Sequence, residues 1–142
     1  TYHGNVMLLD DGRVKLLDFE FSCRNHVAFD FANLFAETVM RHGFDEPPHF
    51  DIAEPEFGDA DIAAIIGFYL DNESFPSPAD RQEAATRLVA ETKLALLLPD
   101  YMYAMAAITL ARQPVQRLRF LPYAHRRFHK FLAAYDRAFG DR

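Results

Sequence analysis

Tryptophan is absent from this sequence of 142 residues, and cysteine occurs once, as Cys23. A single cysteine excludes an intrachain disulfide, which fits a reducing compartment, and we expect a cytoplasmic protein. No apolar run reaches the length of about 18 residues that a membrane-spanning helix needs. The sequence therefore predicts no transmembrane segment.

Positive charge is scarce in most of the chain and gathers at its end. From Arg112 onward lie 8 of the 15 basic residues but only 2 of the 21 acidic ones. A cationic helix of this kind is usually a solvated face, and no nucleic-acid-binding motif accompanies it. We therefore expect no nucleic-acid partner.

Apolar residues, by contrast, are plentiful. Hydrophobic residues make up 50% of the chain, and 14 Phe and 6 Tyr supply the aromatic part. This length and composition suit one domain, or one lobe of a larger domain, with a buried core.

Two short apolar runs, Val6–Leu9 and Val14–Leu17, flank the turn sequence Asp10-Asp11-Gly12. An Asp-Gly step between such runs predicts a β-hairpin. Asn5 precedes the first run and Asp18 follows the second, so antiparallel pairing would bring an amide and a carboxylate to the same end of the hairpin. Such oxygen ligands can hold a magnesium ion beside phosphate groups.

An Asn, a hairpin and the triplet Asp18-Phe19-Glu20 resemble the catalytic loop and metal-binding triplet of protein-kinase-like phosphotransferases. Glu20 stands where protein kinases usually have Gly, and the sequence AFDFANLFAE follows shortly after it. These features resemble the choline/ethanolamine kinase family. The resemblance runs from Thr1 to about Arg41 and resumes over Tyr101–Phe128.

The resemblance implies an α+β, mostly α fold: one hairpin carrying the metal site, followed by a helical bundle, as in the C-terminal lobe of a protein-kinase-like fold. It also implies ATP as co-substrate and Mg²⁺ as cofactor. Asn5 and Asp18 would be the catalytic metal ligands, and Glu20 would assist cofactor binding. The reaction would phosphorylate a small amino alcohol, in the first step of phosphatidylcholine or phosphatidylethanolamine synthesis.

For the amino alcohol, the resemblance implies a pocket formed by Glu37, Tyr103, Phe120 and Tyr123. Glu37 matches an acidic residue of the family's cationic-substrate pocket. Where the family has two Trp residues three apart, this sequence has Tyr103 and Ala106. Fewer rings around the cation favour ethanolamine, or dual specificity, over choline alone.

The same resemblance leads us to expect that residues 1–142 form a C-terminal lobe without the N-terminal ATP-binding lobe. The family's catalytic Asp lies five residues before the loop Asn, and counting back from Asn5 reaches no residue of this sequence. We therefore expect these residues alone to be inactive. The resemblance also allows a homodimer of the full-length enzyme.

Helical periodicity begins at about Ala28 and predicts further helices after a long loop. The expected elements are a helix from about Ala28, a loop over Gly43–Gly58, and helices over Ala60–Leu70, Ala79–Leu98, Asp100–Arg112 and Tyr123–Phe139, with Pro122 opening the last.

Two other functions remain open from the sequence. An aminoglycoside-phosphotransferase-like kinase shares the loop and hairpin but normally has Gly where Glu20 stands. A non-catalytic, kinase-derived binding module would also fit a chain that begins after the catalytic Asp.

Overall fold

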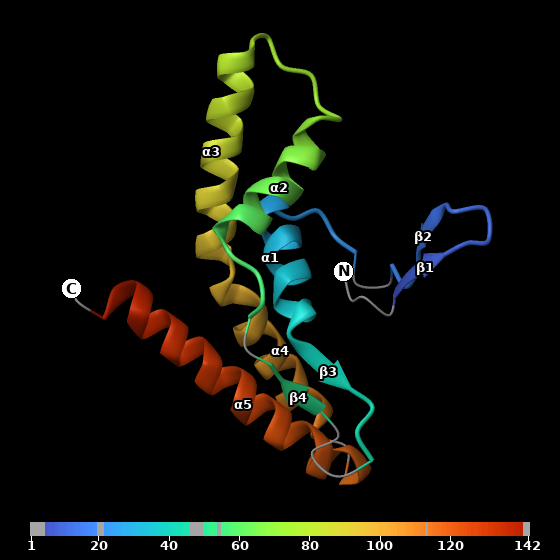
Figure 1. Ribbon diagram of the computed structural model, residues 1–142. Helices are drawn as coiled ribbons and strands as arrows, with labels where there is room; N and C mark the ends of the chain where they lie inside the picture. Colours follow the sequence, from blue (N-terminus) through green and yellow to red (C-terminus); the bar gives the residue numbers. More distant parts are fainter. Residues whose placement is uncertain (1–4, 20–21, 46–49, 54, 113, 141–142) are drawn as a thin grey trace.

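The computed structural model describes residues 5–19, 22–45, 50–53, 55–112 and 114–140 (Figure 1). Within these ranges the chain is mostly helical, with two small antiparallel sheets. In chain order the elements are β1 (Val6–Leu8), β2 (Val14–Leu16), α1 (Val27–Thr38), β3 (Met40–His42), β4 (Phe50–Ile52), α2 (Asp59–Leu70), α3 (Pro78–Ala95), α4 (Leu97–Leu110) and α5 (Pro114–Phe139). The predicted class, α+β and mostly α, is confirmed.

The first hairpin forms around the Asp-Gly step, as predicted. β1 and β2 pair antiparallel, with Val6 opposite Leu16. Gly12 has a φ of 81°, which favours glycine, and its N–H donates to the Leu9 carbonyl at 2.9 Å. The hairpin extends away from the helices, and the residues of both strands are exposed (Figure 1).

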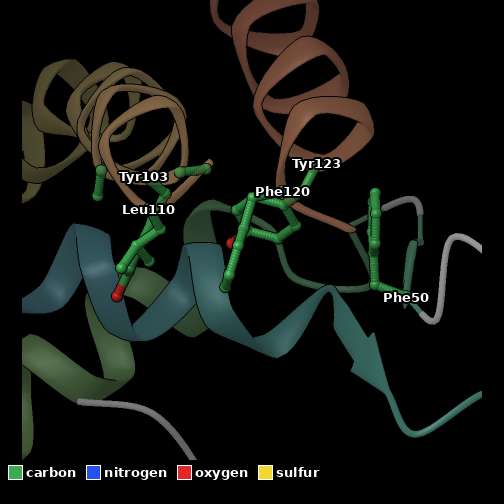
Figure 2. Close-up of a pocket in the computed structure, with 7 residues that line it drawn as sticks. Phe50, Tyr103, Leu110, Phe120 and Tyr123 are labelled. Atoms are coloured by element: carbon green, nitrogen blue, oxygen red, sulfur yellow. The ribbon is translucent and has the colours of Figure 1, made fainter. Parts of the chain in front are cut away.

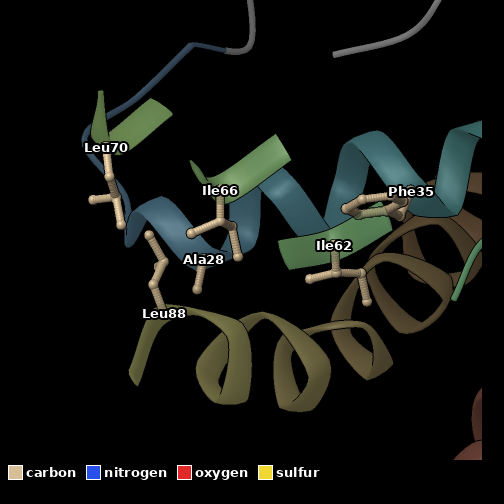
Figure 3. Close-up of a cluster of buried hydrophobic side chains, with 6 residues drawn as sticks. All are labelled: Ala28, Phe35, Ile62, Ile66, Leu70 and Leu88. Carbon is tan, nitrogen blue, oxygen red and sulfur yellow. The ribbon is translucent and has the colours of Figure 1, made fainter. Parts of the chain in front are cut away.

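The apolar core lies where α1, α2 and α3 meet (Figure 3). Its buried members are Ala28, Phe35, Ile62, Ile66, Leu70 and Leu88. Burying a side chain such as Ile66, which is 0% exposed, stabilises the fold by about 1.5–3 kcal/mol. This core fixes α1, whose last turn carries Glu37.

The two last helices, α4 and α5, pack along one another (Figure 1). Ala104, Ala107 and Ala124 are buried, with exposed fractions of 0%, 2% and 4%. Small side chains allow two helices to approach closely. The packing brings Asp100 of α4 beside Arg127 of α5.

The expectation of a loop over Gly43–Gly58, and of only one hairpin, was wrong. β3 and β4 form a second hairpin, in which Met40 lies opposite Ile52 and His42 opposite Phe50. The connection between them is long, so no short turn motif signals the pairing, and each strand has only three residues.

Three predicted helix boundaries were also wrong, the end of α3, the start of α4 and the start of α5, and each had been placed next to a proline. α3 ends at Ala95, because the ring of Pro99 clashes with the carbonyl four residues earlier; Pro99 instead lies in the first turn of α4, where its missing N–H is not needed. α5 begins at Pro114 and continues through Pro122. We read Pro122 as a helix start, but the packing of α5 on α4 outweighs the cost of an internal proline.

Among the described residues, Pro78–Leu110 is the one stretch whose length and composition would permit a membrane span. It comprises two helices separated at Leu96, which pack against α1, α2 and α5. Core helices commonly have the same composition, so this is weak evidence for a span.

Candidate active site

The hairpin brings the two predicted metal ligands together. The side-chain amide of Asn5 donates to Oδ2 of Asp18 at 3.3 Å. The Leu17 N–H donates to the Asn5 carbonyl at 2.8 Å, which extends the backbone pairing to the end of the hairpin. Asp18 has a φ of 60°, a left-handed conformation that costs about 1–2 kcal/mol outside glycine but that Asp tolerates. Such strain is common at functional positions.

The chemistry of this pair fits a magnesium ion. Carboxylate and amide oxygens are hard ligands, and Mg²⁺ in phosphate-transferring sites usually takes one or two carboxylates, with phosphates and water filling the rest. Asp18 is exposed, so its carboxylate is open to a ligand. No group of three His, Cys, Asp or Glu suited to a metal occurs in the part of the chain that the structure describes. Glu20, the third predicted cofactor residue, lies outside the described residues.

A charge cluster of Glu37, Asp100 and Arg127 joins α1, α4 and α5. Arg127 donates from Nη2 to Oε1 of Glu37 at 2.8 Å and from Nη1 to Oδ1 of Asp100 at 2.6 Å. The exposed fractions are 5% for Glu37, 4% for Asp100 and 0% for Arg127. Lys130 adds a contact of 3.3 Å to Oδ2 of Asp100. Glu37 and Asp100 share the buried guanidinium of Arg127, and with Lys130 the two carboxylates are balanced by two cations.

The guanidinium of Arg127 also lies against two aromatic rings. Its carbon is 4.9 Å from the ring centroid of Tyr103 and 5.3 Å from that of Tyr123. Its Nε donates to the Tyr123 hydroxyl at 3.0 Å. These contacts fix both rings through cation–π attraction and one hydrogen bond.

Burial changes the pKa values of Tyr103, Tyr123 and Arg127. It raises the pKa of Tyr103, where the charge of Glu37 adds to the effect, and it also raises the pKa of Tyr123, which Arg127 opposes. Burial alone would lower the pKa of Arg127, but Tyr123, Asp100 and Glu37 together raise it. Arg127 is therefore charged, and both tyrosines keep their protons, at neutral pH.

The same two tyrosines line a cavity of about 190 Å³, which we call the aromatic pocket (Figure 2). Its lining residues are Phe50, Tyr103, Ala106, Ala107, Leu110, Phe120 and Tyr123. They come from β4, α4 and α5. The rings of Phe50 and Tyr123 meet edge to face, with centroids 5.0 Å apart. The lining is apolar apart from the tyrosine hydroxyls.

The structure gathers three of the four predicted substrate residues, Tyr103, Phe120 and Tyr123, around this pocket. Glu37 is not among the lining residues and instead pairs with Arg127. Ala106 also lines the pocket.

Sequence reasoning missed Arg127 and Phe50. Arg127 follows Tyr123 by four residues and Ala124 by three, a spacing that places it on the inward face of the helix. That spacing was available as a signal. Phe50 was missed because its strand was read as a loop.

Comparison with known proteins gives consistent matches. A family model described as choline/ethanolamine kinase matches residues 1–132. Over 60 residues the chain is 38% identical to choline kinase A2 of Caenorhabditis elegans. This alignment covers 42% of this chain and 14% of that protein. A crystal structure of choline kinase from Cryptosporidium parvum Iowa II matches with a TM-score of 0.79 and 19% identity, over 99% of this chain and 38% of that one. At that identity the structural match shows a shared fold alone, and the chain spans well under half of either relative.

Proposed function

The chain belongs to the choline/ethanolamine kinase family, and from that premise we propose that its full-length protein transfers the γ-phosphate of ATP to the hydroxyl of a small amino alcohol. The observation that carries the proposal is the contact between Asn5 and Asp18 at 3.3 Å, the two residues to which the sequence resemblance assigns the metal. The product would be a phosphorylated head group for phospholipid synthesis.

In this proposal Asn5 and Asp18 hold Mg²⁺, and Glu20 assists them. The bound ion supplies charge neutralisation for the phosphates of ATP. The protein contributes position: the hairpin sets the distance between the two side chains, and the left-handed backbone at Asp18 sets the direction of its carboxylate. Phosphoryl transfer depends largely on such positioning.

The aromatic pocket would receive the ammonium end of the acceptor. A quaternary ammonium carries no N–H, so it needs ring faces and a nearby negative charge rather than hydrogen-bond acceptors. The walls of the pocket offer the ring faces, and the Glu37 carboxylate supplies a negative charge that its partner Arg127, which lies against Tyr103 and Tyr123, partly offsets. Glu37 would then attract the cation at a distance instead of contacting it.

The composition of the aromatic pocket favours a different acceptor from the one that the sequence favoured. A primary ammonium has three donors to satisfy, but the aromatic pocket has only tyrosine hydroxyls as side-chain acceptors, and that of Tyr123 already accepts from Arg127; the Glu37 carboxylate does not line the pocket. We therefore propose choline as the better acceptor, where the sequence favoured ethanolamine or dual specificity.

The test is ADP release by the full-length protein with Mg-ATP and either choline or ethanolamine. The proposal expects acceptor-dependent turnover, with a higher kcat/KM for choline. Nucleotide binding without turnover on either acceptor would contradict the kinase assignment. A higher kcat/KM for ethanolamine would contradict the substrate assignment while leaving the reaction in place.

A further inference from the structure

A second cavity, of about 490 Å³, lies between α1, α5 and the junction of α3 and α4. We call it the basic pocket. Most of its wall is apolar, chiefly Phe35, Val39, Phe57, Leu94, Leu97 and Ala134. The rings of Phe35 and Phe57 pack with their centroids 4.7 Å apart, which gives the wall a rigid aromatic side.

Three cationic side chains also line this pocket: Lys93 from α3, and Lys130 and Arg137 from α5. Asp100 is its only anionic lining residue within the described chain, and both of its oxygens are engaged, Oδ1 by Arg127 and Oδ2 by Lys130. Lys93 is held in place by Asp59 at 2.6 Å. With Asp59 counted beside the lining residues, three cations face two carboxylates, an excess of one positive charge beside an apolar wall, whereas the aromatic pocket has no charged lining residue.

From this combination we infer that the basic pocket binds the carboxylate form of a single-chain fatty acid. The alkyl chain would lie against the apolar wall, and the carboxylate would pair with the cationic side chains. Pockets for small ligands have volumes of about 300–1,000 Å³, and this one lies in the lower part of that range. It therefore suits one alkyl chain better than the two chains of a phospholipid. A monoanion also suffers less repulsion from Asp100 than a dianionic phosphate would.

The site is independent of the proposed kinase reaction, so its test measures binding. Isothermal titration of the full-length protein with decanoate, below the concentration at which it forms micelles, should give one saturable site. The uncharged 1-decanol has the same chain length, and we expect it to bind at least about tenfold more weakly because it cannot pair with a cation. Octanoate lacks two methylenes, each worth roughly fourfold in affinity, so it should bind about 15-fold more weakly than decanoate.

The double variant Lys93→Gln and Arg137→Gln removes two of the three cations; both residues are exposed, so losing the Lys93–Asp59 pair should cost under about 1 kcal/mol of stability. It should lose at least about tenfold in affinity for decanoate while binding 1-decanol as before. Arg87→Gln is the matched control, because Arg87 also lies on α3 in an exposed ion pair, with Glu91, but does not line the pocket. That variant should bind decanoate as the unaltered protein does.

Three outcomes would overturn the inference. The first is that decanoate does not bind, whether or not another segment of the full-length protein occupies the cavity. Equal affinity for decanoate and 1-decanol is the second. The third is an equal loss in Arg87→Gln and in the double variant, which would indicate a general effect of net charge.

Discussion

The first hairpin and the charge cluster place their polar groups by opposite means. In the hairpin, backbone pairing brings Asn5 and Asp18 together across 13 positions of sequence, in an exposed contact. In the charge cluster, helix packing brings Glu37 and Arg127 together across 90 positions and buries both. The side chains of Asn5 and Asp18 therefore stay open to a ligand. The side chains of the charge cluster are shielded from water, and Arg127 holds the rings of Tyr103 and Tyr123. Substitutions in the hairpin should therefore change chemistry, and those in the cluster should change stability first.

The largest expected effect is a loss of activity on substitution of Asp18 in the first hairpin. Asp18→Ala in the full-length protein should lower kcat at least about 10³-fold, because a carboxylate that neutralises phosphate charge is lost. The free energy of unfolding should fall by no more than about 1–2 kcal/mol, because Asp18 is exposed and the cost comes from placing Ala in a left-handed backbone conformation. Steady-state ADP release and urea unfolding measure the two effects. The control Asp10→Ala, at the turn end of the same hairpin, should keep full activity, and activity retained by Asp18→Ala would remove Asp18 from the site.

Arg127→Met tests the charge cluster. It leaves Glu37 and Asp100 buried without their shared guanidinium, which typically costs about 3–5 kcal/mol of stability. Its neighbour Arg126 forms a partly exposed pair with Asp51 at 3.2 Å, so Arg126→Met should cost under about 1 kcal/mol. Urea unfolding of both variants gives the comparison. Equal losses would mean that the cluster is not buried in the protein.

Ala106→Trp would sharpen the account of the aromatic pocket. Ala106 is exposed at the pocket wall, so a ring there adds a face for the ammonium without entering the core. One such face is worth about 0.5–2 kcal/mol, which lowers the KM for choline by roughly 2- to 30-fold. Ethanolamine should gain less. Ala133→Trp, an exposed position on α5 outside the pocket, serves as the control and should leave both KM values unchanged.

The smallest expected effect is a loss of folding stability at alkaline pH. Burial raises the pKa of Tyr103 and of Tyr123, so above about pH 10 the unfolded chain ionises these tyrosines before the folded chain does. The folded state then holds more protons, and its stability falls as the pH rises. Near-ultraviolet absorbance of tyrosinate should show a late component that Tyr103→Phe and Tyr123→Phe each reduce. A late component that survives both substitutions would contradict the burial of these hydroxyls.

The hairpin could be predicted because its signal is local. The Asp-Gly step, the two flanking apolar runs and the polar residues at their ends all lie within Asn5–Asp18, and pairing follows from the turn. The second hairpin has no comparable signal, since a long connection separates Met40–His42 from Phe50–Ile52. Its contacts with α5, Phe50 against Tyr123 and Asp51 with Arg126, join residues more than 70 positions apart, which single-sequence patterns do not give.

The site was predicted only in part, for the same reason. Tyr103, Phe120 and Tyr123 were inferred from family resemblance, and they do line one pocket. Arg127 looked like one more cation in a basic helix, because its acidic partners lie 90 and 27 positions away. Its burial follows from those distant carboxylates, so spacing along α5 could indicate only the inward direction of the side chain.

The central claim is that ring faces of the aromatic pocket, rather than a direct contact with Glu37, receive a quaternary ammonium. Saturation-transfer NMR of choline with the full-length protein tests it most directly. The account predicts transfer from aromatic ring protons to the N-methyl protons of choline, with loss of the signal in Tyr123→Leu. Unchanged transfer in that variant, or no transfer to choline that binds, would contradict the account.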